Sequence, residues 1–394
     1  MMQKKKIILK NKEKFIRLMN VISWLDECRW SEENAVDIIN YCSDDIKNCE
    51  KILTHCLCYI TDRVMPFERI WEKGGLVFSE LVKEYSKGNI PFEYIEKKYY
   101  IKYPSKDGVE KFKFKSDNYE FASHYITNDY ECIKQTLQIL EDYNRNIVKF
   151  IVDILEKYKD NTDLLKRVAF ALHLLTYSLN NKKADTGEIV RILGNEAEFN
   201  QNFKIFEKKS TNGKKRLWCC IRDYKKGPHH DIFKKAIVEI DSISEKDKEI
   251  LVETWDKLPM NQIELPGDVW NNNPIFRENL FGDIIEDINN IPKTWGMPKI
   301  IRELFEQLSE DEKGEYYPEQ FDITFDFVPR MCGNKLCDIC LFGKNGIDLI
   351  CIPSQDKLCP VALISCGYKK ECKNDKEDCD IIRNISKGLC KGTD

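Results

Sequence analysis

The amino-acid sequence predicts a mainly α-helical protein with one small β-hairpin and a cysteine-rich, metal-binding module in its C-terminal part. Apolar residues recur at three- and four-residue spacing over most of residues 14–308, which is the pattern of helices that bury one face. Residues 97–115 instead alternate apolar and charged side chains around Asp107-Gly108, which is typical of a hairpin. Nine of the seventeen cysteines fall within residues 331–394, a density that indicates a metal site.

Composition sets wide limits on function. At 394 residues the chain has room for two or three domains. The net charge of −4 does not exclude nucleic acid as a partner, because local basic patches matter more than the sum. The longest apolar runs are too short to span a bilayer, and the lysine-rich N-terminus lacks the apolar core of a signal peptide. We therefore expect a cytoplasmic protein without membrane contact, whose cysteines are thiols or metal ligands rather than disulfides.

We expect three consecutive parts along the chain. Residues 1–125 form a helical N-terminal domain that includes the hairpin, residues 126–330 form a second helical domain, and residues 331–394 form the cysteine-rich module. Helical periodicity covers these stretches: Lys14–Cys28, Ser31–Tyr41, Asp45–Val64, Leu76–Tyr85, Tyr130–Glu141, Asn144–Lys157, Asp163–Leu179, Thr186–Phe206, Asp231–Ile240 and Glu245–Leu258.

Outside the C-terminal cysteine-rich module, two groups of residues could bind a metal by their type, and we interpret both as structural. Adjacent side chains on a chain point in different directions, so His229 and His230, which follow Gly227-Pro228, are interpreted as a polar loop. Scattered cysteines at helical positions are typical of a hydrophobic core, and this interpretation applies to Cys28, Cys42, Cys49, Cys56 and Cys58.

Two short stretches in the second half carry the residues of chemical interest. Residues 213–224, Gly-Lys-Lys-Arg-Leu-Trp-Cys-Cys-Ile-Arg-Asp-Tyr, indicate a buried helix opened by basic side chains. Residues 263–271, Ile-Glu-Leu-Pro-Gly-Asp-Val-Trp-Asn, indicate a turn that opens a helix. Asp268 stands at its cap position, where a carboxylate accepts hydrogen bonds from backbone N–H groups that have no helical partner. Taken alone, each stretch is more typical of an ordinary helix.

The order of these features resembles that of the helix-hairpin-helix DNA glycosylase superfamily. A basic-led buried helix, an apolar-Pro-x-Asp turn, a further helix and a cysteine-ligated module follow one another over roughly residues 130–345. The most similar branch is that of the archaeal-type 8-oxoguanine glycosylases and their relatives. In that family a lysine near the start of the first helix and an aspartate at the head of the later helix face each other across a base-binding cleft.

The resemblance implies a DNA glycosylase that flips out a modified or damaged base and cleaves its N-glycosidic bond. Asp268 would be the essential carboxylate, and Lys215, or failing it Lys214, would match the family's lysine. Such a lysine attacks the sugar and permits lyase chemistry when burial or cationic neighbours lower its pKa. Trp218 and Trp270 would stack on the extruded base, with core packing as the alternative, and Arg222 would be a further substrate contact.

Three departures from the family pattern concern the region around Asp268. No glycine-rich hairpin of the Leu-Pro-Gly-Val-Gly type precedes this residue, so the usual backbone grip on DNA phosphate is in doubt. Gly-Asp-Val-Trp replaces the more usual Asp-Thr-His or Asp-Ser-Arg. The separation between Lys215 and Asp268 exceeds the family's usual one, which implies an insertion around residues 227–262.

The C-terminal cysteines predict a metal centre. Cys332, Cys337 and Cys340 follow the spacing C-x4-C-x2-C, and we favour Cys359 as the fourth ligand because a Cys-Pro pair often ends an iron–sulfur ligand run. Cys351 is the alternative fourth ligand. Glycosylases with a [4Fe–4S] cluster commonly use C-x6-C-x2-C-x5-C, so Zn²⁺ bound by four thiolates stays the alternative cofactor. The later cysteines, from Cys366 onward, are either ligands of a second ion or reduced thiols.

The predicted partner is double-stranded DNA with a modified or damaged base, bound by a monomer. The large N-terminal region suggests tailoring to an unusual base, such as a bulky modified cytosine in viral DNA, and hence a role in repair or antiviral defence. One alternative is a non-catalytic nucleic-acid-binding protein with a zinc module. A second alternative is an enzyme that acts on a free nucleoside or on RNA.

Overall fold

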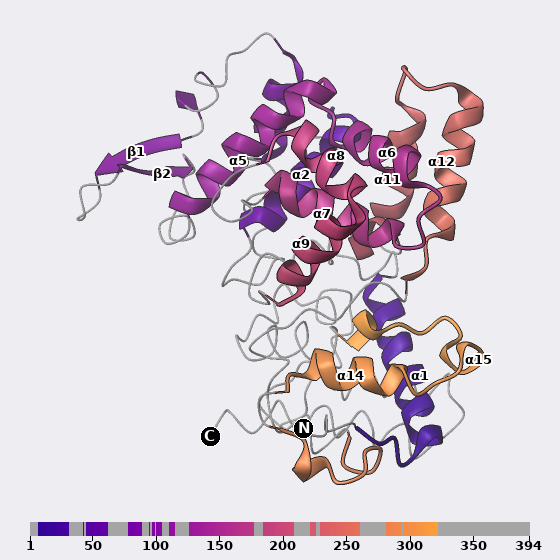
Figure 1. Ribbon diagram of the computed structural model, residues 1–394. Coiled ribbons are helices and arrows are strands. Elements are labelled where there is room, and N and C mark those ends of the chain that lie inside the picture. Colours follow the sequence, from indigo (N-terminus) through magenta and orange to yellow (C-terminus); the bar gives the residue numbers. More distant parts are fainter. Residues whose placement is uncertain are drawn as a thin grey trace, which may run out of the picture. The chain divides into compact units, whose positions relative to one another are not determined.

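Figure 1 shows the computed structural model of the protein, which is mainly α-helical. The structure describes residues 7–30, 42, 45–61, 78–88, 94, 97–98, 100–104, 110–114, 126–176, 184–208, 221–225, 229–260, 281–292 and 295–321. Among these residues, no helix combines the length and the apolarity that crossing a membrane requires. The chain divides into two compact units, one made of residues 1–35 with 263–394 and the other of residues 36–262.

The first unit joins two distant parts of the sequence. Its described elements are α1 (Lys12–Trp30), the 3-10 helix η6 (Ile288–Asn290), α14 (Met297–Phe305), α15 (Glu310–Lys313) and the 3-10 helix η7 (Pro318–Phe321). Phe15 of α1 is completely buried, with its ring edge-on to Phe305 at 5.7 Å and stacked on Phe321 at 6.3 Å between centroids. Leu9 also forms an antiparallel bridge with Ile285. These contacts explain why the structural division does not coincide with the expected boundaries near residues 125 and 330.

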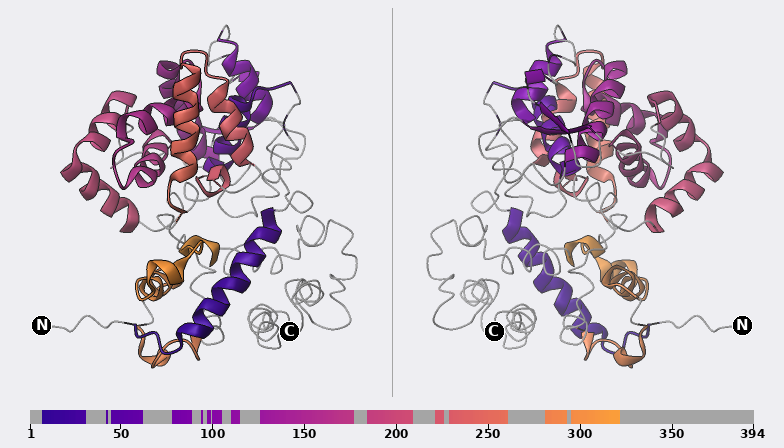
Figure 2. Two further views of the ribbon diagram at one scale, coloured as in Figure 1. Left: turned by 90° about the vertical axis from the view of Figure 1, so that its right-hand side faces the viewer. Right: turned by 90° about the vertical axis from the view of Figure 1, so that its left-hand side faces the viewer.

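The second unit holds most of the described helices. They are α2 (Asn48–Thr61), α5 (Ile126–Leu140), the 3-10 helix η3 (Glu141–Tyr143), α6 (Ile147–Tyr158), α7 (Leu164–Thr176), α8 (Thr186–Gly194), α9 (Glu196–Lys208), α11 (His229–Val238) and α12 (Glu245–Lys257). Residues 78–86 and 221–225 are also helical. Helix α6 is the centre of this unit, because it packs against α2, α7, α11 and α12. Figure 2 shows the unit from two further sides, with α11 beside α12.

The sequence of α6 explains its central position. The side chain of Asn146 accepts hydrogen bonds from the backbone N–H groups of Val148 and Lys149, and this cap fixes where the helix begins. Apolar residues then cover more than one face of the helix, and residues such as Phe150 and Ile154 are completely inaccessible to solvent. A helix that is apolar on several sides is buried in the middle of a domain, as α6 is here.

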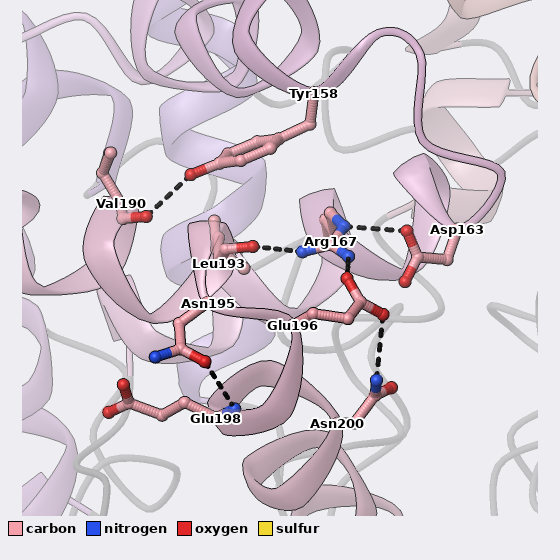
Figure 3. A network of polar contacts seen from close by, with 9 residues as sticks. All are labelled: Tyr158, Asp163, Arg167, Val190, Leu193, Asn195, Glu196, Glu198 and Asn200. Carbon is pink, nitrogen blue, oxygen red and sulfur yellow. Dashed lines mark hydrogen bonds and ion pairs between the residues drawn. The ribbon is translucent and has the colours of Figure 1, made fainter.

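Helices α7, α8 and α9 are held together by the buried guanidinium of Arg167, whose contacts are drawn in Figure 3. Its Nε donates to Asp163 at 2.7 Å, its Nη2 donates to Glu196 at 2.5 Å, and its Nη1 donates to the carbonyl oxygen of Leu193. The guanidinium also lies 4.2 Å from the centroid of the Phe199 ring. One side chain thus connects the end of α8 and the start of α9 to α7.

The expectation of a single helix over Thr186–Phe206 is wrong. The backbone at Asn195 is extended, with φ −93° and ψ 103°, and this residue separates α8 from α9. The side chain of Asn195 accepts a hydrogen bond from the N–H of Glu198 and so caps α9. Apolar periodicity does not detect the break, because both helices present their apolar faces to the same core.

The two strands of the structure lie within the range where the sequence predicts a hairpin. Strand β1 (Tyr100–Pro104) pairs antiparallel with β2 (Glu110–Phe114), and Tyr100 lies opposite Phe114. Residues 105–109, which would form the turn, lie outside the described residues, as do the expected helix Ser31–Tyr41 and the whole cysteine-rich module. The other helices expected from periodicity coincide with observed helices to within a few residues, apart from Leu76–Tyr85, of which residues 78–86 are described.

Among the N-terminal cysteines, the structure describes the side chains of four. Cys42, Cys56 and Cys58 are buried and Cys49 is half-buried, as expected for core thiols. Burial, together with the neighbouring Cys42 and Cys56, raises the pKa of Cys58 well above its ordinary value. Cys58 is therefore a protonated thiol, which is a poor metal ligand and a poor nucleophile.

Candidate functional site

The sequence-predicted site residues fall mostly outside the described part of the chain. This applies to Lys214, Lys215, Trp218, Asp268 and Trp270, and to the predicted cluster ligands Cys332, Cys337, Cys340, Cys351 and Cys359. Their roles therefore stay predictions. Arg222 is the exception, because it lies in the short helical stretch 221–225, where its side chain is 1% exposed.

Arg222 leads to a group of polar side chains in the interior of the second unit. Its Nε lies 3.1 Å from Oδ1 of Asp223, the next residue along the chain. The other carboxylate oxygen, Oδ2, lies 3.2 Å from Nε2 of His55, which comes from α2. Both Asp223 and His55 are completely buried. A charged carboxylate in such a place needs a compensating partner, and Arg222 supplies one.

His229 completes this group, which we call the His–Asp–His cluster (His55, Asp223 and His229). His229 is the first residue of α11 and is completely buried. Its ring lies 4.0 Å from the His55 ring between centroids, with the two planes inclined at 32°. One nitrogen or oxygen atom from each member lies within 4.8 Å of the corresponding atom of the other two. Residues from α2, from 221–225 and from α11 therefore meet at one point.

The neighbours of the cluster fix its side chains from outside. The hydroxyl of Tyr224 lies 3.1 Å from Nδ1 of His55 and donates a hydrogen bond of 3.3 Å to the carbonyl oxygen of Ile52. The Tyr224 ring stacks on Phe233 of α11 at 5.4 Å, and Phe233 in turn packs against Trp255 of α12. The cluster thus lies among aromatic side chains from helix 221–225, α11 and α12.

The charges around Asp223 favour its ionised form. Burial alone would raise the pKa of this carboxyl group, but the Arg222 guanidinium and the imidazoles of His55 and His229 lower it by more. The net pKa lies well below the ordinary value. Asp223 is therefore a carboxylate at neutral pH, with Oδ2 directed toward His55.

The end of helix 221–225 is tied to the end of α12. Lys225 donates hydrogen bonds from Nζ to the backbone carbonyls of Trp255 and Asp256, the latter at 3.2 Å. In the opposite direction, the indole Nε1 of Trp255 donates to the carbonyl oxygen of Tyr224 at 3.0 Å. Burial lowers the pKa of Lys225 to about 8. Helix 221–225 is therefore bound to the end of α12 through the backbone carbonyl of Tyr224 and through the side chain of Lys225.

The interpretation of His229 and His230 as a polar loop is wrong. Both residues belong to the first turn of α11, and His230 points to the surface, where its Nε2 lies 2.8 Å from Oδ1 of Asp256. The sequence signal for the cluster is weak, because His55 is a single histidine on an apolar helix face and no spacing relates it to Asp223 or His229. The chain contains only five histidines, and this scarcity is the one sequence feature that could have drawn attention to His55 and His229.

No family model matches the chain, and neither the curated proteins nor the solved structures that were searched contain a match.

Proposed function

We propose that the protein is a cytoplasmic DNA glycosylase that acts as a monomer on double-stranded DNA carrying a modified or damaged base. Water replaces the base at the sugar carbon, and the base leaves with the proton that hydrolysis supplies. Asp268 stabilises the positive charge that develops on the sugar and orients the water, and Trp218 and Trp270 stack on the extruded base. In this proposal a [4Fe–4S] cluster is bound by Cys332, Cys337, Cys340 and Cys359.

The observation that supports this proposal best is the junction between residues 221–225 and α12. The stretch that carries Lys215 leads directly into helix 221–225, and the stretch that carries Asp268 follows α12 along the chain. Lys225 and Trp255 bind these two helical segments to each other through reciprocal hydrogen bonds to backbone carbonyls. The described residues that follow the Lys215 stretch and the helix that precedes the Asp268 stretch along the chain thus belong to one hydrogen-bonded junction.

The burial of helix 221–225 agrees with the sequence interpretation that supports the resemblance. Ile221, Asp223 and Tyr224 are completely buried, so the basic stretch before them is followed by a core helix, as in the family pattern. Lys215 would attack the sugar carbon as an amine in the lyase version of the reaction. The products of that attack are a Schiff base with the sugar and the free base.

Base release from duplex DNA tests the proposal. Purified protein is incubated with duplexes that carry 8-oxoguanine, uracil, an alkylated purine or a bulky modified cytosine, and the released base is measured by mass spectrometry. We expect release from at least one of these duplexes, and its loss in Asp268→Asn with DNA binding retained. The matched control is Asp241→Asn, an exposed aspartate, which should keep full activity. Absence of release from every duplex contradicts the proposal.

The alternatives give different outcomes in the same assay. DNA binding without base release, by a colourless protein that contains zinc, would indicate the non-catalytic nucleic-acid-binding protein. Release from a nucleoside or from RNA but not from DNA would indicate the other enzyme class. Borohydride distinguishes the hydrolytic glycosylase from the lyase version. It reduces the Schiff base of the lyase version to a stable amine, which joins the protein covalently to DNA. Lys215→Gln should abolish that covalent product.

A further inference from the structure

We propose that the His–Asp–His cluster binds one divalent transition metal ion, with Zn²⁺ as the reference ion, at a site separate from the C-terminal cysteines. The ligands are Nε2 of His55, Oδ2 of Asp223 and one ring nitrogen of His229. This site is independent of the proposed glycosylase activity, since none of its residues is assigned to the cleavage of the glycosidic bond.

The distances within the cluster suit a small tetrahedral ion. With bonds of about 2.0–2.1 Å, two ligands of a tetrahedral zinc ion lie about 3.3–3.4 Å apart. Nε2 of His55 and Oδ2 of Asp223 are 3.2 Å apart, which is close to this length. The widest separation among the three ligand atoms is within 4.8 Å, so small rotations of side chains bring all three to bonding distance.

The hydrogen bonds around His55 determine what its Nε2 offers to Asp223. The Tyr224 hydroxyl lies within hydrogen-bonding distance of both the Nδ1 of His55 and the carbonyl oxygen of Ile52. When its single proton is donated to Ile52, the hydroxyl accepts at Nδ1, and the neutral imidazole then has a lone pair on Nε2 for a metal ion. In the other tautomer Nε2 donates a hydrogen bond to Oδ2 of Asp223, 3.2 Å away. A bound metal ion takes the place of that proton.

The neighbours of the cluster act as the outer partners that metal sites usually have. A ligating histidine normally uses its other ring nitrogen in a hydrogen bond, and Tyr224 provides that partner for His55. A ligating carboxylate is normally held at its second oxygen, and Arg222 provides that contact for Asp223 at 3.1 Å. With these contacts in place, Nε2 of His55 and Oδ2 of Asp223 lie 3.2 Å apart.

The ligand types and charges predict which ions bind. Two imidazoles and one carboxylate favour Zn²⁺, Co²⁺ or Ni²⁺ over Ca²⁺ and Mg²⁺, which require more oxygen ligands. Arg222 already neutralises Asp223, so a bound ion adds positive charge to a buried place. A hydroxide as the fourth ligand reduces that charge, and a zinc ion lowers the pKa of its bound water enough to form one near neutral pH.

Metal content in matched variants tests the site. Untagged full-length protein is treated with chelator, dialysed against a small excess of Zn²⁺ and analysed by elemental mass spectrometry. We expect the double variant His55→Gln and His229→Gln to hold one zinc ion per chain fewer than the wild type. The control His230→Gln changes the half-buried neighbour on the same helix, which is not a member of the cluster, and should keep the wild-type zinc content. Equal zinc content in the wild type and a folded double variant overturns the proposal.

A second measurement decides the matter if the double variant does not fold, as judged by its circular dichroism. Accessible thiols of the wild-type protein are blocked with N-ethylmaleimide, and the product is titrated with Co²⁺. We expect one tightly bound cobalt ion with visible d–d bands and without the intense near-ultraviolet band of thiolate-bound cobalt. If no cobalt binds under these conditions, the cation between His55 and Asp223 is a proton, and the proposal is wrong.

Discussion

The indole Nε1 of Trp255 donates a hydrogen bond of 3.0 Å to the carbonyl oxygen of Tyr224, and both side chains are completely buried. This bond connects α12 to the short helix 221–225, at the residue that follows Asp223 of the His–Asp–His cluster. The Trp255 ring also lies 4.6 Å from Phe233 of α11 between centroids. Trp255 therefore supports the backbone from which Asp223 projects.

Substitution of Trp255 should weaken this support. Trp255→Phe removes the indole N–H that donates to the buried carbonyl oxygen of Tyr224. The smaller ring also leaves a small cavity. We expect a loss of about 2 kcal/mol or more in the free energy of unfolding, measured by urea denaturation. Glu253→Gln, at an exposed position of the same helix, is the control. Equal midpoints for the two variants would contradict this account of Trp255.

Arg167 should be the most sensitive charged residue of α7. Arg167→Met removes the hydrogen bonds to Asp163, Glu196 and the buried carbonyl of Leu193 at once. We expect a loss of about 2–3 kcal/mol in the free energy of unfolding, because hydrogen bonds to charged groups are stronger than neutral ones.

The control for this prediction is Arg191, which also pairs with a glutamate, Glu198, but is exposed. Arg191→Met should change the midpoint of urea denaturation only slightly, because exposed ion pairs contribute little. If Arg191→Met proves as destabilising as Arg167→Met, burial is not the cause of the effect.

Asp256 should make a small contribution to stability that disappears in acid. Burial raises the pKa of this carboxyl group, but hydrogen bonds from Lys234 and His230 lower it by more, so the folded pKa lies below the ordinary value of about 3.9. A lowered carboxyl pKa stabilises the fold at pH values above the unfolded pKa, and this stabilisation is lost as the pH falls through the folded pKa.

Asp256→Asn should therefore lower the melting temperature at pH 6, and the two proteins should converge below about pH 3. The side chain of Asp256 is 38% exposed, so solvent screening limits the effect at pH 6 to about 0.5 kcal/mol. Melting curves between about pH 2 and pH 7 provide the measurement. A difference that grows toward low pH would show that the sign of the pKa shift is wrong.

The buried thiols should resist alkylation in the native protein. Cys56 and Cys58 are each 1% exposed, and burial raises the pKa of Cys58, so neither offers an accessible thiolate. We expect N-ethylmaleimide to leave both unmodified at pH 7 and to modify both completely in guanidinium chloride, as read by peptide mass spectrometry. Rapid native modification of either cysteine would place it at the surface.

The helices of this protein were largely predictable, since most are amphipathic, and the buried positions of α12 (Lys248, Leu251 and Trp255) follow the helical period. The break at Asn195 was not predicted, because apolar periodicity continues across it, and the carbonyl oxygen of Leu193 at the end of α8 accepts a hydrogen bond from Arg167 of another helix. Local periodicity contains no information about such a contact. The same limit applies to the N-terminal helix α1, whose partner Phe305 comes from a distant part of the chain.

Only some residues in and around the His–Asp–His cluster could be recognised from the sequence. Asp223 and Arg222 were recognised as polar residues within a buried helix, but His55 and His229 became significant only through their distances from Asp223. Metal ligands that share a short motif can be identified from spacing, whereas these three come from separate helices. Their proximity is a property of how α2 and α11 pack, which the sequence does not display.

The discontinuous first unit has a consequence for the order of events during synthesis. Residues 36–262 emerge from the ribosome as one uninterrupted piece, so their unit can fold while translation continues. Phe15 emerges earlier but must wait for Phe305 and Phe321 before its ring can be buried. The side of α1 that carries Phe15 therefore lacks Phe305 and Phe321, its partners in the folded unit, through most of translation.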